Sequence, residues 1–158
     1  LLSRKKILME RSIIMMNNRN SYFPSAHKSV MVVEDERPLL DVIQLKLESN
    51  GFDILTARSV SQALDFLSQI NGGVDIIWLD HYLLGKDDGI VFITKVKQNQ
   101  KWRDIPFVVV SNSSSEETRQ LYLNAGADRF YVKADTALDS IVTEVRELLD
   151  LPVTRKSD

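Results

Sequence analysis

Five short apolar runs alternate with stretches of helical periodicity, and this alternation restricts the possible folds more than any other feature of the sequence. The runs cover residues 29–33, 52–57, 74–80, 105–111 and 128–133. Each run is rich in β-branched or aromatic residues and too short for a typical helix, which predicts a strand. The stretches between and after them repeat apolar residues every three or four positions, which predicts five amphipathic helices. Strict alternation of this kind favours an α/β fold with a doubly wound parallel sheet covered by helices on both faces.

Length and composition fit a single domain with short extensions. The chain has 158 residues, no cysteine and a formal charge of −2, so nothing indicates disulfides, a thiolate metal site or a strongly basic surface. We therefore expect a cytoplasmic protein without membrane insertion and without direct nucleic-acid binding. The expected divisions are an N-terminal extension over residues 1–27, flexible or partly helical, a domain over residues 28–150 and a C-terminal tail over residues 151–158.

Chemically active side chains stand at the end of four of the five predicted strands. Glu34 and Asp35 follow the first run, Asp80 ends the third, Ser111 ends the fourth and Lys133 ends the fifth. The carboxyl ends of parallel strands form one edge of an open sheet, where ligands bind near the point at which strand order reverses. We expect these side chains to gather at that edge.

Each of these residues also has a purely structural explanation. Asp35 or Glu36 could cap the helix that begins near Pro38, because a proline lacking its N–H suits the first helical turn. The aspartate and the serine are common turn formers, and a lysine at a strand end is often solvated. The structural explanations are less convincing together than singly, because the residue types complement one another.

The combination of acids, lysine and serine points to phosphoryl chemistry. Carboxylates that converge raise one another's pKa unless a cation neutralises them. Mg²⁺ prefers one or two carboxylates and accepts phosphate oxygens as further ligands. A carboxylate beside it can act as a nucleophile toward phosphorus, while a lysine ammonium and a serine hydroxyl hold the oxygens of the transferred group. The sequence therefore predicts a phosphoryl acceptor.

Four segments in order carry a resemblance to a known family. The segments VVEDE, LDHYLLGKDDG, VVVSNSSS and FYVKAD resemble those of the receiver domain of two-component response regulators, and the similarity extends over about residues 28–150. The 22-residue interval from Ser111 to Lys133 is typical of that family, whereas the 9-residue interval from Asp80 to Gly89 is one longer than usual. The resemblance implies a flavodoxin-like sheet with strand order 2-1-3-4-5 and five helices.

The resemblance also implies a role for each of these strand-end residues. Asp80 would be the phosphoacceptor. Glu34, Asp35, Asp80 and the backbone carbonyl of Tyr82 would hold Mg²⁺.

Three further residues would contact or sense the phosphoryl group. Ser111 and Lys133 would bind its oxygens, and Phe130, three positions before the lysine, would take the place of the aromatic switch residue.

The sequence departs from the family pattern at several positions near this site. Ala134 stands where a proline with a cis bond is usual, so the strand-end lysine could be aimed differently. Tyr82, Asn112 and Ser113 occupy positions that tune hydrolysis of the acyl phosphate, and shielding by Tyr82 and Asn112 would make the phosphorylated state long-lived. We expect the ring of His81 to point into solvent.

These features favour a single-domain response regulator, because the C-terminal tail leaves no room for a DNA-binding domain. It would receive its phosphoryl group from a sensor histidine kinase or a histidine phosphotransfer protein. It would then signal to a downstream protein, whose identity is unknown, through the surface of the last two helices and fifth strand. Such a chain assists its own phosphorylation and dephosphorylation but is not an enzyme in the ordinary sense.

Two alternatives stay open. The first is a receiver-like binding module that is not phosphorylated, which the residues Ala134 and Asn112 would allow. The second is a Mg²⁺-dependent phosphatase with Asp80 as its nucleophile, although that class usually carries a second aspartate where this chain has Tyr82.

Overall fold

The predicted parallel sheet is present in the computed structural model, which describes residues 27–70 and 73–152. Its strands run in the order β2-β1-β3-β4-β5, and all neighbouring pairs are parallel. The strands are β1 (Ser29–Val33), β2 (Asp53–Ala57), β3 (Ile76–Leu79), β4 (Phe107–Ser111) and β5 (Arg129–Val132). The predicted fold class and strand order are confirmed.

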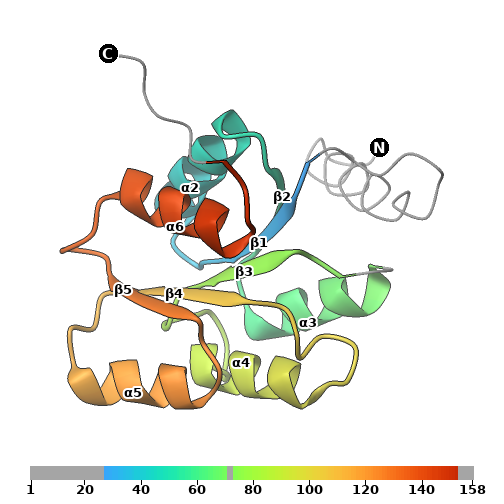
Figure 1. Cartoon of the computed structure of the whole chain (residues 1–158). Helices are drawn as coiled ribbons and strands as arrows, with labels where there is room; N and C mark the ends of the chain where they lie inside the picture. Colours follow the sequence, from blue (N-terminus) through green and yellow to red (C-terminus); the bar gives the residue numbers. More distant parts are fainter. Residues whose placement is uncertain (1–26, 71–72, 153–158) are drawn as a thin grey trace.

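Helices cover both faces of the sheet (Figure 1). They are α2 (Arg37–Ser49), α3 (Val60–Gln69), α4 (Gly89–Gln98), α5 (Glu116–Asn124) and α6 (Leu138–Leu148). Helices α2 and α6 lie on one face, and α3, α4 and α5 lie on the other. No helix among the described residues is both long and apolar enough to cross a membrane.

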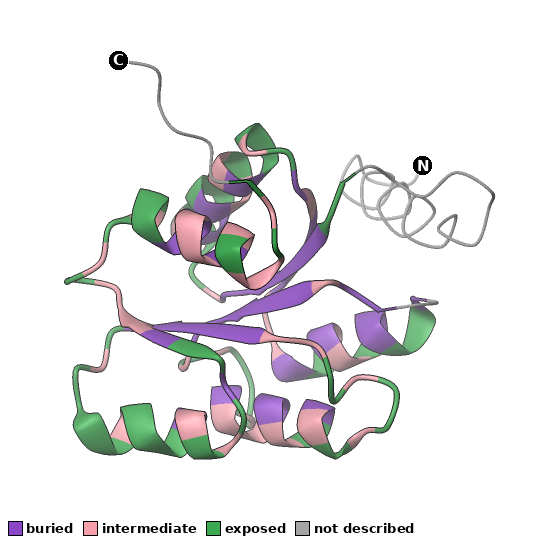
Figure 2. Ribbon diagram, viewed as in Figure 1, coloured by how far each residue is buried: buried purple, intermediate pink, exposed green. Residues whose placement is uncertain are grey.

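The sheet separates two apolar cores (Figure 2). Side chains alternate along each strand, so Met31 and Val33 face one core while Val30 and Val32 face the other. The first core packs beneath α3, α4 and α5, and the second packs beneath α2 and α6. Because β1, β3 and β4 are buried on both sides, their sequences are nearly continuous apolar runs.

Local sequence signals set most helix ends. Ser59, Asp88 and Ser115 accept a hydrogen bond from a backbone N–H of the first turn of α3, α4 and α5, respectively. Gly51 and Gly126 follow α2 and α5 with φ of +83° and +104°, a conformation that costs a glycine little. These two glycines end their helices.

Two expectations about element ends were wrong in detail. Strands β3 and β4 are shorter than the predicted runs over residues 74–80 and 105–111. Residues at the ends of these runs continue the apolar pattern or follow it directly, but they are not part of the strands. Glu36 occupies the N-cap position of α2, but its side chain makes no capping hydrogen bond. Its backbone N–H instead donates to the Glu34 carboxylate at 3.1 Å, so the acid that makes a hydrogen bond at the start of α2 is Glu34.

The predicted N-terminal extension, apart from His27, and nearly all of the predicted tail lie outside the described residues.

Candidate functional site

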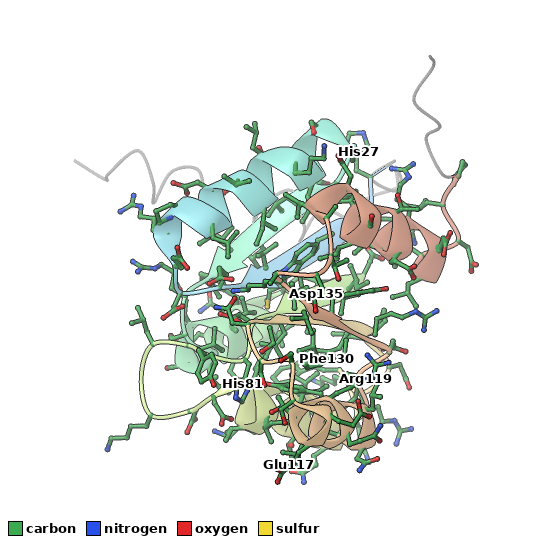
Figure 3. The ribbon with its side chains drawn as sticks, turned by 90° about the vertical axis from the view of Figure 1, so that its left-hand side faces the viewer. His27, His81, Glu117, Arg119, Phe130 and Asp135 are labelled. Carbon is green, nitrogen blue, oxygen red and sulfur yellow. The ribbon has the colours of Figure 1, made fainter. Side chains whose placement is uncertain are left out.

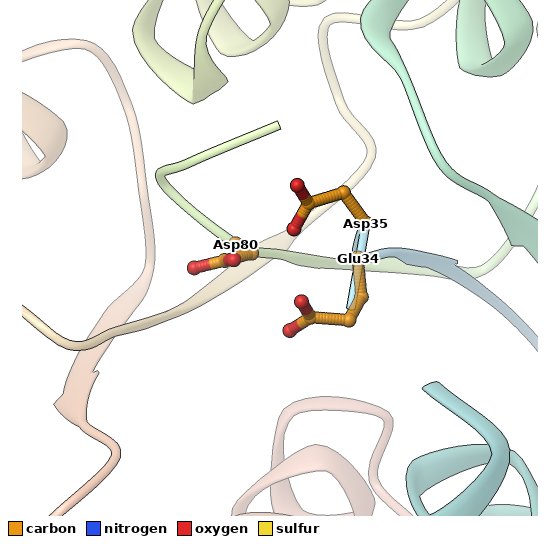
Figure 4. A group of neighbouring side chains, drawn as sticks. All are labelled: Glu34, Asp35 and Asp80. Atoms are coloured by element: carbon orange, nitrogen blue, oxygen red, sulfur yellow. The ribbon is translucent and has the colours of Figure 1, made fainter. Parts of the chain in front are cut away.

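Three carboxylates meet at the carboxyl edge of the sheet (Figure 4). Glu34 and Asp35 follow β1, and Asp80 follows β3, the neighbouring strand in the sheet. One oxygen from each of the three acids lies within 4.8 Å of the others. Glu34 is fully buried and Asp80 is 3% exposed, whereas Asp35 is half-buried. The convergence predicted from the strand ends is therefore present in the structure.

Lys133, the residue directly after β5, contacts two of these acids. Its Nζ lies 2.9 Å from Glu34 Oε2 and 3.3 Å from Asp80 Oδ2. Its side chain is 14% exposed, so the structural explanation of a solvated strand end was wrong. Lys133 thus pairs with an acid that lies 99 positions earlier in the sequence.

Burial and charge shift the pKa values of these groups. Burial raises the pKa of Glu34 to about 7, and the nearby Asp80 charge adds to this, while the hydrogen bond from Lys133 opposes it. Burial also raises the pKa of Asp80 against the lowering effect of Lys133. For Lys133, burial alone would lower the pKa, but the hydrogen bond to Glu34 and the charges of both acids outweigh it and raise the value.

The charges of this group suit a hard divalent cation. With every group ionised, three acids and one lysine carry −3 + 1 = −2. A cation with oxygen ligands would offset this charge and the cost of keeping two acids buried. The donor set of three carboxylate oxygens is consistent with Mg²⁺.

Ser111 lies at the same edge, at the end of β4, and is fully buried. Its hydroxyl accepts a hydrogen bond from the Ser113 backbone N–H at 3.0 Å. Asn112, the next residue, is exposed, and so is Tyr82, whose relative exposure is 59%. Phe130 is 5% exposed, so its ring occupies the inward position.

The peptide bond between Lys133 and Ala134 is trans, since the described residues contain no cis bond. The lysine nevertheless reaches Glu34 and Asp80. Alanine in place of the usual proline therefore does not withdraw the ammonium group from the acids.

Sequence reasoning missed one contact of Asp35. Arg58, just after β2, donates from Nε and Nη2 to the Asp35 backbone carbonyl at 3.1 and 2.8 Å. It holds the backbone from which the Asp35 carboxylate projects. No local signal in the sequence predicts a pairing across 23 positions.

The expectation for His81 was wrong. Its ring does not project freely into solvent: Nδ1 lies 2.7 Å from the Tyr122 hydroxyl, and the residue is half-buried. The partner comes from α5, 41 positions later, so the sequence alone could not reveal it.

A five-stranded doubly wound sheet with clustered acids and a lysine at its carboxyl edge is the arrangement that the sequence predicted for a receiver domain. The family model of the response regulator receiver domain matches residues 30–146. The chain belongs to the response regulator receiver family, which acts in two-component signalling. Receiver domains in general accept phosphoryl groups from histidine kinases.

Known relatives match over the receiver part. The phosphate regulon transcriptional regulatory protein PhoB of Escherichia coli K12 is 36% identical over 106 residues, which are 67% of this chain and 45% of PhoB. PhoB of Pseudomonas aeruginosa is 29% identical over the same shares. The chain thus matches less than half the length of these curated relatives.

Solved receiver structures share the fold. The phosphorylated cyanobacterial phytochrome response regulator RcpA superposes with a TM-score of 0.70 at 26% identity, over 84% of this chain and 100% of RcpA. A CheY-like receiver domain from Methanospirillum hungatei JF-1 superposes with a TM-score of 0.71 at 22% identity, over 79% of this chain and 95% of that one.

Proposed function

We propose that this protein is a cytoplasmic single-domain response regulator that accepts a phosphoryl group on Asp80 in a Mg²⁺-dependent reaction. The observation that carries the proposal is the placement of Lys133 Nζ against both Glu34 and Asp80, beside a third carboxylate. This arrangement offers a nucleophile, a cation site and a fixed positive charge at one sheet edge.

The chemical step needs little beyond positioning. An Asp80 carboxylate oxygen attacks the phosphorus of a phosphohistidine, and the bond from phosphorus to the imidazole nitrogen breaks. The electron pair leaves with that nitrogen, which takes up a proton. Mg²⁺, when bound, would neutralise charge on the phosphoryl oxygens and would be held by Glu34, Asp35, Asp80 and the Tyr82 carbonyl.

The other residues around the acceptor have subsidiary roles in this proposal. Lys133 exchanges its contact with Asp80 for one with a phosphoryl oxygen, and the Ser111 hydroxyl binds another. Phe130 is the aromatic switch residue. Tyr82, Asn112 and Ser113 govern how fast water reaches the acyl phosphate, and the first two make the phosphorylated state long-lived.

The proposed partners are a sensor histidine kinase or a histidine phosphotransfer protein as donor, and a downstream protein that binds the face formed by α5, β5 and α6. A module that is never phosphorylated is the weaker alternative, because Lys133 contacts Asp80 despite the trans bond to Ala134. A phosphatase is also a weaker alternative, because position 82 carries a tyrosine and not the second aspartate that is usual in that class.

Incubation with Mg²⁺ and acetyl phosphate, a small phosphoryl donor, tests the proposal. Intact mass spectrometry should detect one phosphoryl adduct on the wild-type protein and none on Asp80→Asn. The adduct should also be absent when EDTA removes the metal. A wild-type protein without adduct, or an Asp80→Asn protein that gains it, would contradict the proposed acceptor.

A further inference from the structure

The residue after the acceptor is fixed by three separate hydrogen bonds. The backbone N–H of His81 donates to Asp80 Oδ1 at 2.7 Å, and its carbonyl accepts from the Gly89 N–H at 3.0 Å. Its ring Nδ1 lies 2.7 Å from the Tyr122 hydroxyl. His81 therefore connects the acceptor carboxylate directly to a side chain of helix α5.

Tyr122 is the only buried side chain of α5. Its ring is 0% exposed and burial raises the pKa of its phenol, so the hydroxyl stays protonated and needs a polar partner. His81 supplies that partner. Because α5 enters the core through this one residue, the position of Tyr122 strongly constrains the position of the helix.

Gly89 leaves the space that this contact requires. A Cβ atom at position 89 would collide with the Tyr122 hydroxyl oxygen and would lie 2.7 Å from the Asp80 carbonyl oxygen. The hydroxyl is thus packed closely against Gly89, the first residue of α4, which directly follows the acceptor loop, residues 81–88.

Helix α5 also contacts the strand that carries the proposed switch residue. The Tyr122 and Phe130 rings lie 5.8 Å apart between centroids, and Arg119 Nη1 donates to the Phe130 carbonyl at 3.3 Å. Arg119 and Tyr122 are three positions apart, so they project from the same side of the helix. Figure 3 shows His81, Arg119 and Phe130 in the region where α5 meets the sheet.

We propose that the Tyr122 hydroxyl is a positioning group that transmits phosphorylation of Asp80, through His81, to helix α5 and to Phe130. This inference rests on the proposed phosphorylation of Asp80. An acyl phosphate is a weaker hydrogen-bond acceptor than a carboxylate, so it loosens the His81 N–H contact and lets the His81 backbone move. The ring contact with Tyr122 then carries that movement into α5.

A hydrogen bond between a serine hydroxyl and an aromatic hydroxyl cannot transmit the change from Asp80 to β5 in this protein. Phe130 lacks a hydroxyl, so its ring cannot form a hydrogen bond with the Ser111 hydroxyl. Transmission through His81 and Tyr122 starts from the acceptor loop and reaches the same part of the molecule.

Beryllofluoride with Mg²⁺, a stable mimic of the phosphoryl group, provides the test. Backbone amide chemical shifts of ¹⁵N-labelled protein should change on addition of the mimic in the acceptor loop, in α5 and in β5. In Tyr122→Phe the acceptor-loop changes should persist at saturating mimic, while the α5 changes should fall at least twofold. Tyr131→Phe, which removes a hydroxyl from β5 on the opposite face of the sheet, should respond like the wild type.

His81→Phe removes the other half of the contact and protects the test against a folding defect in one variant. It should reduce the α5 changes to the same extent, and the double variant should show no further loss, because both substitutions break one interaction. Undiminished α5 changes in folded Tyr122→Phe, or additive losses in the double variant, would overturn the transmission role alone. A wild-type protein that responds neither to beryllofluoride nor to acetyl phosphate would overturn the proposed function and this inference with it.

Discussion

Glu34 is unusual among the residues of the site because it is a fully buried acid with a lysine within hydrogen-bonding distance. A buried ion pair gains Coulomb energy but loses the hydration of both charges, so its net contribution to stability is small or unfavourable. The raised pKa of Glu34, to about 7, expresses that cost. Keeping this acid buried therefore costs folding stability.

Stability should therefore depend on pH through Glu34. Its pKa is about 7 in the folded state and near the ordinary value of 4.5 in the unfolded chain, so the folded state holds its proton more tightly. As pH rises from about 4.5 to about 7, the unfolded state ionises first and the free energy of unfolding falls, by an amount on the order of 3 kcal/mol. Asp80, whose pKa is also raised, acts in the same direction.

Urea unfolding of Glu34→Gln in EDTA from pH 4 to pH 8 measures this contribution. The variant should lose less stability than the wild type over this range, whereas the exposed control Glu117→Gln should follow the wild type. Equal pH dependence in Glu34→Gln and wild type would show that Glu34 ionises normally in the folded protein.

At the scale of elements, periodicity predicted all five strands and all five helices of the domain. The apolar runs of β1, β3 and β4 could be recognised because both faces of these strands are buried. Parallel topology then placed Asp80, Ser111 and Lys133 at one edge. Contacts of Arg58 and Tyr122 could not be predicted, because they depend on how loops and helices pack against one another and leave no periodic signal in the sequence.

Arg58 offers a test of how a loop orients Asp35, a proposed metal ligand. Its guanidinium makes two hydrogen bonds to the Asp35 carbonyl, and a lysine would keep the charge but could not reproduce this forked geometry. Arg58→Lys should weaken Mg²⁺ binding about 3- to 10-fold, in the range typical of residues that orient metal ligands or slightly below it.

Calorimetric titration with Mg²⁺ measures this effect. The exposed control Arg103→Lys should bind Mg²⁺ like the wild type. Phosphorylation of Arg58→Lys should recover at saturating Mg²⁺, because the acceptor itself is unchanged. Unaltered Mg²⁺ affinity would mean that the Asp35 backbone keeps its place without the forked contact.

At the scale of the whole molecule, one sheet is shared by two separate cores. Val96 of α4 is fully buried in the first core, and Val145 of α6 is fully buried in the second. Because the strands contribute side chains to both, neither core can form without the sheet. Unfolding should therefore be a single cooperative transition.

Truncation of one valine in each core tests this. Val96→Ala and Val145→Ala should each lower the free energy of unfolding by about 2 kcal/mol, and the double variant by about their sum, because the sites are on opposite faces of the sheet. Circular dichroism and tryptophan fluorescence should report one coincident transition for all three. Two separated transitions in the double variant would show that the cores unfold independently.

The contact between Lys133 and Glu34 spans 99 positions, and β1 and β5 are not neighbours in the sheet. During synthesis Asp80, Glu34 and Asp35 leave the ribosome well before Lys133 does. An incomplete chain ending within β4 could place three acids together but would have no ammonium group to hold a transferred phosphoryl group. Under the proposed function, the order in which the strands are made would therefore keep a nascent chain from being phosphorylated until β5 has been added.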